Sequence, residues 1–365
     1  MSRKIYHPLS FIAGLIISCQ VFSQTASFFS NTEIGIQAHY GSFITAVPKA
    51  DYVKDSYSYF GEVWFSKPLY ANEYENNRSM TRWGAGVFFG HTGSKEYLGK
   101  MGGLYPFLDF HLFGVNRFES RLRAGLGIGF VEKPYNVETN HKNLLIGSRA
   151  NLFIEAVWKN CFYVSDRLQF NAGLSFSHLS NATIKLPNLG LNIPAFSVGA
   201  GYLINQSTTK ETARPDSFDN KLKYNLQLTA GVKQSPWVES NIYKTAILTI
   251  EATKQKSLKT RYGAGIALLY DPAVDDQYLD PIISVNEKSY SILNVAPYIS
   301  YEKIIGRLSV PIQLGMYVLP NPWKRFYQNL GLRYRVNQHW SLGGFLKTHM
   351  GRADFVHAGI NYSFN

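Results

Sequence analysis

The sequence predicts an all-β protein, an antiparallel up-and-down β-barrel of the outer-membrane type. Three observations favour this fold class. Apolar residues recur at every second position, the alternating segments are about ten residues long, and no apolar run beyond the N-terminus approaches the length of a spanning helix. Strands of soluble proteins are usually about five or six residues long. Because about ten residues is the length of a tilted membrane strand, we expect the apolar face to meet lipid.

The composition agrees with this fold and excludes several others. The 365 residues carry 37 Lys and Arg against 25 Asp and Glu, a net charge of +12, and only 17% are charged. Aromatic residues make up 15%, which suits side chains gathered at a membrane boundary. Two cysteines exclude a disulfide scaffold and a cysteine-rich zinc site. The nine histidines show no metal-ligand spacing, so we expect no metal and no cofactor. Loop acids such as Asp271 would offer calcium ligands, although loop acids are usually solvated.

Residues 1–24 are interpreted as a secretory signal peptide. Arg3 and Lys4 supply its basic start, and residues 9–18 supply an apolar stretch about half as long as a spanning helix. Cleavage after this segment leaves a mature charge of about +10. Cys19 also resembles the cysteine of a lipoprotein signal, which is the alternative. A chain exported by this signal is either soluble and secreted or crosses a membrane as strands.

About sixteen segments alternate with period 2. In the segment near 119–131, Leu122, Leu126 and Phe130 share one face, and Arg123 and three glycines share the other. Connections after the fourth, sixth, twelfth and fourteenth segments are tight and those after the fifth, seventh and eleventh are long, as in outer-membrane barrels. We expect strands near 32–46, 57–67, 80–91, 102–114, 119–131, 149–162, 167–179, 193–204, 221–234, 242–255, 259–270, 290–302, 307–319, 325–336, 339–349 and 354–364.

The chain also looks duplicated. TRWGAGV from Thr81 recurs as TRYGAGI from Thr260, and RLQFNAGLSFSHLS from Arg167 loosely matches HWSLGGFLKTHMGR from His339. The polar stretch 205–221 is interpreted as a linker, which divides the mature chain into halves at 25–204 and 222–365. Each half then holds about eight strands. A barrel of eight strands has an interior that is just wide enough for side chains. We therefore favour two tandem eight-stranded barrels over one sixteen-stranded barrel, although repetition alone does not decide between them.

The segment 177–192, SHLSNATIKLPNLGLN, carries the candidate chemistry. His178 and Ser180 lie two residues apart on a strand, so both belong to the face that also carries Leu174 and Phe176. An ionisable group on a lipid-facing side is a functional candidate. A Ser–His pair is the core of nucleophilic acyl transfer, in which the imidazole takes the hydroxyl proton. The alternative is an interfacial histidine beside a solvated loop serine, since short motifs often match by chance.

The wider pattern resembles a known family. HLSNA from His178, followed by PNLG from Pro187, resembles the signature of the lipid A 3-O-deacylases, outer-membrane enzymes built as eight-stranded barrels. Upstream, residues 139–143 and 146–148 resemble longer relatives described as acyloxyacyl hydrolases. The resemblance covers roughly 80–204, the first half of the chain.

The resemblance implies a role for each matching residue. Ser180 is expected to be the nucleophile and His178 the general base. Asn181 and Asn188 are expected to stabilise the oxyanion, which requires preorganised hydrogen-bond donors. Gly190 corresponds to the glycine that shapes the loop of the family.

One position departs from the family pattern. Two residues after Gly190 the family has a glutamate that orients the histidine, and here the residue is Asn192. An asparagine can orient an imidazole by a hydrogen bond, but it cannot stabilise imidazolium by charge. Three possibilities remain at this stage: Asn192 serves as the third residue, Glu132 or Glu138 supplies the acid, or activity is weak or absent.

The implied function is an outer-membrane serine esterase that removes an ester-linked acyl chain from lipid A. Its partners would be lipopolysaccharide and the lipids of the bacterial outer membrane, with no cofactor. The positive net charge favours anionic surfaces, and it is equally compatible with basic residues lining the barrel and its rims. Nucleic acid is a poor alternative for an exported barrel. The competing hypothesis is a non-enzymatic barrel, either a pore or a scaffold, including a degenerate deacylase.

The second half lacks the constellation. The ungapped match sets Met350 against His178 and Arg352 against Ser180. His349 is one residue away, so alternation turns it to the opposite side. We therefore expect the second half to be non-catalytic, with a role in folding, packing or substrate binding.

Overall fold

The structure is a computed structural model that describes most of the chain. It covers residues 31–45, 48–69, 81–204, 218–234, 241–276, 291–320, 325–350 and 352–364. The predicted signal peptide and most of the predicted linker, 205–221, lie outside the described residues. Within the described ranges, no helix has both the length and the apolar character needed to cross a bilayer.

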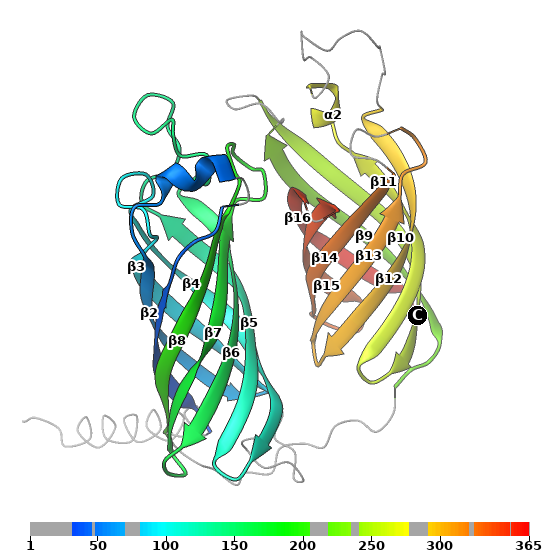
Figure 1. The fold of residues 1–365 in the computed structure, drawn as a ribbon. Coiled ribbons are helices and arrows are strands. Elements are labelled where there is room, and N and C mark those ends of the chain that lie inside the picture. The colour runs from blue at the N-terminus through cyan, green and yellow to red at the C-terminus, as the bar shows by residue number, and fades with distance from the viewer. Residues whose placement is uncertain are drawn as a thin grey trace, which may run out of the picture.

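Sixteen strands form two closed barrels, one from each half of the chain (Figure 1). Each strand corresponds to one predicted segment, with ends that differ by a few residues. The first barrel consists of β1 (Glu33–Gly41), β2 (Ser58–Pro68), β3 (Arg82–His91), β4 (Lys100–Val115), β5 (Phe118–Val131), β6 (Ala150–Tyr163), β7 (Leu168–Ser180) and β8 (Leu191–Leu203). The second consists of β9 (Leu222–Gln234), β10 (Ile242–Ser257), β11 (Thr260–Tyr270), β12 (Leu293–Ile305), β13 (Leu308–Met316), β14 (Phe326–Arg335), β15 (Trp340–His349) and β16 (Arg352–Phe364). Two short helices, η1 (Pro48–Val53) and α2 (Ala273–Asp276), follow β1 and β11.

Strand pairing decides the number of barrels. Every neighbouring pair is antiparallel, β8 returns to pair with β1, and β16 returns to pair with β9. The prediction of two eight-stranded barrels is confirmed, and a single sixteen-stranded cylinder is excluded. The sequence repeats fall on corresponding strands: TRWGAGV and TRYGAGI lie at the third strand of each barrel, β3 and β11, and the longer pair lies at the seventh, β7 and β15.

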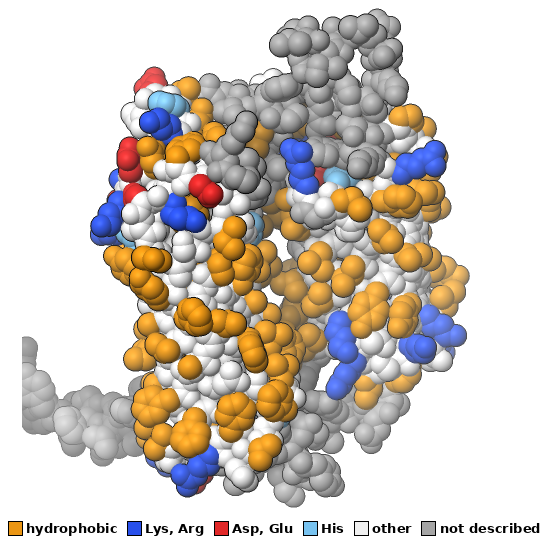
Figure 2. Space-filling model, in the orientation of Figure 1, with side chains coloured by type: hydrophobic (Ala, Val, Ile, Leu, Met, Phe, Trp, Pro, Cys, Tyr) orange, Lys and Arg blue, Asp and Glu red, His pale blue; other side chains and the backbone are white. Residues whose placement is uncertain are grey.

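The apolar faces point outward, as the alternation predicts. On β3, Val87 and Phe89 have 63% and 64% of their surface exposed, and Figure 2 shows hydrophobic side chains distributed over the outer surfaces of both barrels. The inward faces are not only small and polar, as they are on the segment near 119–131; some also carry large aromatic side chains. Phe88, between those two residues, is buried inside with Tyr105 and Phe107. Inward glycines make the room, since a Cβ on Gly86 would lie 2.9 Å from the Tyr105 ring.

Charged pairs fill much of each barrel. In the first barrel the guanidinium of Arg123 contacts Glu62 and lies 4.7 Å from the ring centre of Trp64. In the second barrel Arg333 Nη1 lies 3.2 Å from Glu302 Oε1, and both side chains are buried. An eight-stranded barrel has an interior only wide enough for side chains, and these interiors are occupied by them.

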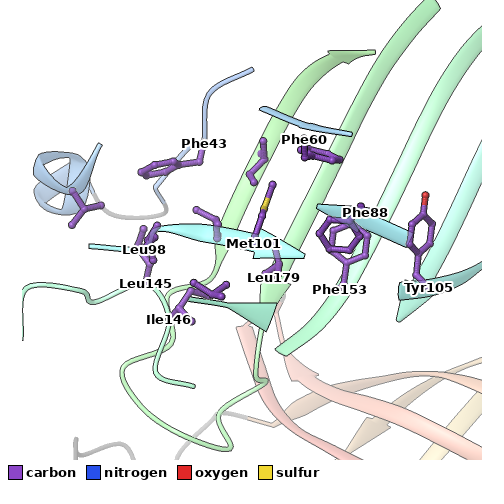
Figure 3. Close-up of a cluster of buried hydrophobic side chains, with 14 of the residues drawn as sticks. Phe43, Phe60, Phe88, Leu98, Met101, Tyr105, Leu145, Ile146, Phe153 and Leu179 are labelled. Carbon is purple, nitrogen blue, oxygen red and sulfur yellow. The ribbon is translucent and has the colours of Figure 1, made fainter. Parts of the chain in front are cut away.

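The two ends of the first barrel differ. Short connections join β4 to β5 and β6 to β7 at one end. The long connections after β1, β3, β5 and β7 gather at the other, which we call the loop end. There Phe43, Leu98, Leu145, Ile146 and Leu179 are completely buried against one another (Figure 3). Apolar residues from three connections and from β7 itself thus build a small core that supports the end of β7.

Candidate active site

The two candidate catalytic side chains leave the end of β7 on its outward face. His178 and Ser180 are half-buried, on the same side as the exposed Phe176. Leu179, between them, points inward and is completely buried in the core at the loop end. The strand therefore has an anchored residue between two that face outward, as the period of 2 requires.

His178 hydrogen-bonds to Ser180 and to one of the candidates for the third residue. Its Nε2 lies 2.9 Å from Ser180 Oγ, and its Nδ1 lies 2.7 Å from Asn192 Oδ1. The register explains the second contact, because Asn192 on β8 is paired directly with His178 on β7. A neutral imidazole with its proton on Nδ1 satisfies both bonds, and it leaves the Nε2 lone pair to accept the serine proton.

The geometry separates the three candidates for the third residue. Glu132 Oε2 accepts a hydrogen bond from Lys100 N at 2.8 Å, and Glu138 lies in a turn where its N–H donates to Asn136 Oδ1. Neither has a contact with His178 among the described residues, whereas Asn192 occupies its Nδ1. Asn192 is the side chain that orients the imidazole in this structure.

Gly190 makes room for the imidazole. Its φ is +79°, a left-handed conformation that costs glycine little. A Cβ there would lie 2.8 Å from His178 Cε1, closer than a side chain can approach. Its N–H donates to Leu145 O at 2.9 Å, which joins the β7–β8 loop to the β5–β6 loop. The glycine expected to shape the loop therefore also determines where the histidine ring can lie.

The two candidate oxyanion donors are used differently. The Asn181 amide donates to Ser148 Oγ at 2.8 Å and to Lys185 O at 2.7 Å, so both of its N–H groups are engaged. The Asn188 side chain accepts from Asn181 N at 3.1 Å through its Oδ1. No described residue accepts a hydrogen bond from Asn188 Nδ2, and the residue is half-buried. Within the described part of the chain, Asn188 Nδ2 is therefore open to a substrate oxygen, while the Asn181 amide holds the loop together.

The β5–β6 loop supports the β7–β8 loop, which carries part of the site. Asn143 Nδ2 donates to Lys133 O at 2.9 Å, and its Oδ1 accepts from Leu145 N and Ile146 N. Asn140 Nδ2 donates to Tyr97 O at 2.9 Å in the β3–β4 connection. The sequence indicated this segment only through its resemblance to acyloxyacyl hydrolases. Its structural role, which sequence reasoning missed, is to stiffen the loop against which Gly190 packs.

One group inside the first barrel has metal-ligand chemistry. His39, Glu62 and Glu155 have ligand atoms within 4.8 Å of one another, and all three are buried. The guanidinium of Arg123 contacts Glu62 and already supplies positive charge there. These side chains point into the barrel, on the opposite face of the sheet from His178. We interpret the group as part of the buried charge network.

The second barrel has a different arrangement at the matching positions. His349 points inward, as predicted, and its Nε2 lies 2.9 Å from the Tyr317 hydroxyl oxygen. Met350 and Arg352 are exposed. The residues that the sequence match sets against His178 and Ser180 are therefore neither a base nor a nucleophile.

Comparison with known proteins gives a family for each barrel. The family described as "Lipid A 3-O-deacylase (PagL)" matches residues 49–201, and the family described as "Acyloxyacyl hydrolase, C-terminal domain" matches residues 222–365. No curated protein matches the sequence.

Two solved structures resemble one barrel of this chain. Neisserial surface protein A has a TM-score of 0.34 and 9% identity, over 48% of this chain and 98% of its own. The outer membrane enzyme PagL has a TM-score of 0.31 and 17% identity, over 47% of this chain and 99% of its own. The two family matches together extend over most of both barrels, and the chain belongs to the PagL and acyloxyacyl hydrolase family.

Proposed function

We propose that this protein is an outer-membrane serine esterase that removes an ester-linked acyl chain from lipid A. One observation carries the proposal. Ser180, His178 and Asn192 form a hydrogen-bonded row on the outward apolar face, at the loop end of the barrel that matches the lipid A 3-O-deacylase family. A row of this kind is how a weak serine nucleophile is activated.

The first half of the reaction forms an acyl-enzyme. Ser180 Oγ attacks the ester carbonyl while His178 Nε2, 2.9 Å away, takes the hydroxyl proton. Asn188 Nδ2 donates to the oxyanion of the tetrahedral intermediate. When the intermediate collapses, the sugar hydroxyl leaves with the proton held by His178, and the acyl chain remains on Ser180.

The second half releases the fatty acid. His178 takes a proton from a water molecule, which attacks the acyl-enzyme carbonyl, and Ser180 leaves with that proton. Asn192 holds the imidazole in the same orientation through both steps. It supplies no negative charge to the imidazolium, so the catalytic rate is expected to be lower than with a carboxylate at this position.

The position of the row suits an amphipathic ester. An acyl chain would lie along the outward apolar face of β7, beside the exposed Leu174 and Phe176, with its ester near the polar loop end. We place the loop end at the outer surface of the bacterial outer membrane, where long barrel loops are found and lipopolysaccharide is the lipid. The proposed partners are accordingly lipid A and the neighbouring outer-membrane lipids, and the chemistry needs no cofactor.

A solute pore has less support. Each barrel has eight strands, and buried side chains occupy both interiors. A scaffold derived from a deacylase is the remaining competitor, since Asn192 stands where the family has an acid.

The test is mass spectrometry of lipid A from cells that express the wild type, Ser180→Ala or His178→Ala. We expect loss of one acyl chain with the wild type and intact lipid A with both variants. Ser177→Ala is the matched control, because Ser177 lies on the same strand but is buried on the inward face. Unchanged lipid A with a folded, membrane-inserted wild type would contradict the proposal and favour the scaffold.

A further inference from the structure

We propose that the second barrel is a positioning domain that holds the β7–β8 loop, residues 181–190, in its catalytic conformation. The proposal rests on the proposed function, because it concerns the loop that carries Asn188 and follows Ser180. It gives the non-catalytic barrel a direct part in the reaction, through Gln234 at the end of β9 and Asp354 near the start of β16.

Between described residues, three hydrogen bonds join the loop to the second barrel. Gln234 N donates to Thr183 O at 2.8 Å, and Leu186 N donates to Gln234 Oε1 at 2.6 Å. The Thr183 hydroxyl donates to the backbone oxygen of Asp354. Gln234 is the last residue of β9, and Asp354 lies near the start of β16. The contact therefore lies at the seam where the second barrel closes, and these two strands lie beside the first barrel in Figure 1.

The segment that the second barrel contacts has a strained backbone. Ala182 and Thr183 have φ values of +46° and +68°, in the left-handed region. This region is unfavourable for residues with a Cβ, most of all for a β-branched residue such as threonine. Conformations of this kind persist only where the surroundings hold them. The surroundings here include both the carbonyl and the hydroxyl bonds from Thr183 to the second barrel.

The contact surface on the second barrel is itself rigid. Lys233, adjacent to Gln234, lies 2.8 Å from Asp354 Oδ1, and Lys347 lies 2.6 Å from Asp354 Oδ2. All three charged groups are buried. A carboxylate held by two ammonium groups fixes the start of β16 against β9 and β15. The second barrel thus offers the loop a fixed surface rather than a flexible one.

The strained turn is directly linked to the reacting atoms. Ala182 and Thr183 follow Ser180 by two and three residues, and Asn181 N donates to Asn188 Oδ1. On its other side the loop bonds to the β5–β6 loop through Gly190 N. The loop is therefore held from both sides. Loss of its hydrogen bonds to the second barrel would let Asn188 move relative to Ser180. A displacement of about 1 Å at such a site can lower a catalytic rate about 100-fold.

The experiment compares full-length variants that differ in this contact. Gln234→Ala removes the oxygen that accepts from Leu186 N, and Gln234→Glu restores an acceptor. Gln328→Ala is the matched control. Gln328 lies at the same end of the second barrel, accepts from Met350 N at 2.9 Å, and has no hydrogen bond to the first barrel among the described residues.

Two measurements are made on each variant in detergent micelles. The first is steady-state hydrolysis of purified lipid A. We expect Gln234→Ala to lower kcat about 10-fold with KM changed less than about twofold, and Gln234→Glu to recover most of the rate. The second is hydrogen exchange of peptides from residues 181–190. We expect faster exchange in Gln234→Ala than in the wild type or Gln328→Ala.

The outcomes separate the two proposals. An unchanged kcat in Gln234→Ala, or an equal loss in Gln328→Ala, overturns the positioning role. Unchanged exchange in the loop also overturns it, because the contact would then hold nothing in place. If the wild type and Ser180→Ala both leave lipid A intact, the proposed function fails. Hydrogen exchange in residues 181–190 is then the measurement that decides whether the second barrel orders the loop.

Discussion

The two barrels share one architecture and differ at the end of their seventh strands. On β7, His178 faces outward and bonds to Ser180 and Asn192. On β15, His349 faces inward and bonds to Tyr317 inside the barrel. In the sequence match His349 corresponds to Ser177, which is also buried on the inward side. A shift of one residue along the strand therefore separates a candidate catalytic histidine from a structural one.

The connections that follow these strands differ as well. β7 ends at Ser180 and β8 begins at Leu191, whereas β15 ends at His349 and β16 begins at Arg352. The longer loop carries Asn188 and Gly190, and the shorter connection has no space for either function. Both halves share the barrel as a scaffold. The candidate chemistry depends on whether the histidine faces outward or inward and on which residues the following loop contributes.

The largest effect should come from Asn188, whose Nδ2 donates to no described residue. We expect Asn188→Ala to lower kcat about 10² to 10³-fold, or about 2.7–4 kcal/mol, because a donor to the oxyanion acts only in the transition state. Hydrolysis of purified lipid A measures it. Asn294→Ala is the comparison variant in the second barrel, where the Asn294 amide makes two hydrogen bonds with the backbone of Leu319. Equal losses in the two variants would contradict the difference between the barrels.

A glycine comparison tests the shape of the site. We expect Gly190→Ala to lower kcat about 10²-fold, because the new methyl group would lie 2.8 Å from His178 Cε1 and the backbone φ is +79°. Gly344→Ala on β15 is the control, since its Cβ would meet no atom within 4 Å. Rates of lipid A hydrolysis are compared after both variants are shown to be folded. A fully active Gly190→Ala enzyme would mean that the ring position does not limit catalysis.

The sequence predicted the strands well because a barrel strand leaves a local signal. Alternation such as Val87, Phe88 and Phe89 gives the faces without knowledge of the partners. The number of barrels depends on the partner of β8. Pairing with β1 closes two barrels, whereas pairing with β9 would continue one larger sheet, and no local pattern indicates which pairing forms.

The site shows the same division between local and distant information. The pair His178 and Ser180 could be predicted because both lie on one strand. Asn192 could not be separated from Glu132 and Glu138, since that choice depends on the β7–β8 register. The contact of Thr183 with the second barrel left no sequence signal, because its hydroxyl donates to the backbone oxygen of Asp354, 171 positions away, and a backbone acceptor leaves no mark on the sequence.

A smaller effect, in the direction of higher activity, should follow from charge at position 192. We expect Asn192→Glu to raise kcat at least about 10-fold, because a carboxylate would stabilise the imidazolium that the proposed attack by Ser180 forms. In Asn192→Gln the side chain has nearly the same shape as glutamate without its charge, so kcat should not exceed that of the wild type. Initial rates on lipid A measure both. No gain with the glutamate would show that charge at this position does not limit the proposed reaction.

The smallest effect on activity should come from the inward histidine of the second barrel. We expect His349→Phe to keep lipid A hydrolysis within about twofold of the wild type. Asp354 loses its 3.7 Å contact with His349 Nδ1, but it remains held by the closer Lys233 and Lys347. The variant should lose stability by about 1–3 kcal/mol, since the buried Tyr317 hydroxyl loses its partner. Denaturant unfolding of the purified protein measures the loss.

The same substitution separates two roles of the second barrel. If that barrel acts only by holding the β7–β8 loop through Gln234 and Asp354, a lesion inside it that leaves both residues in place changes stability and leaves kcat unchanged. A fall of more than about 10-fold in kcat for a folded His349→Phe protein would mean that His349 takes part in catalysis. The difference between an outward and an inward histidine would then no longer distinguish the two barrels.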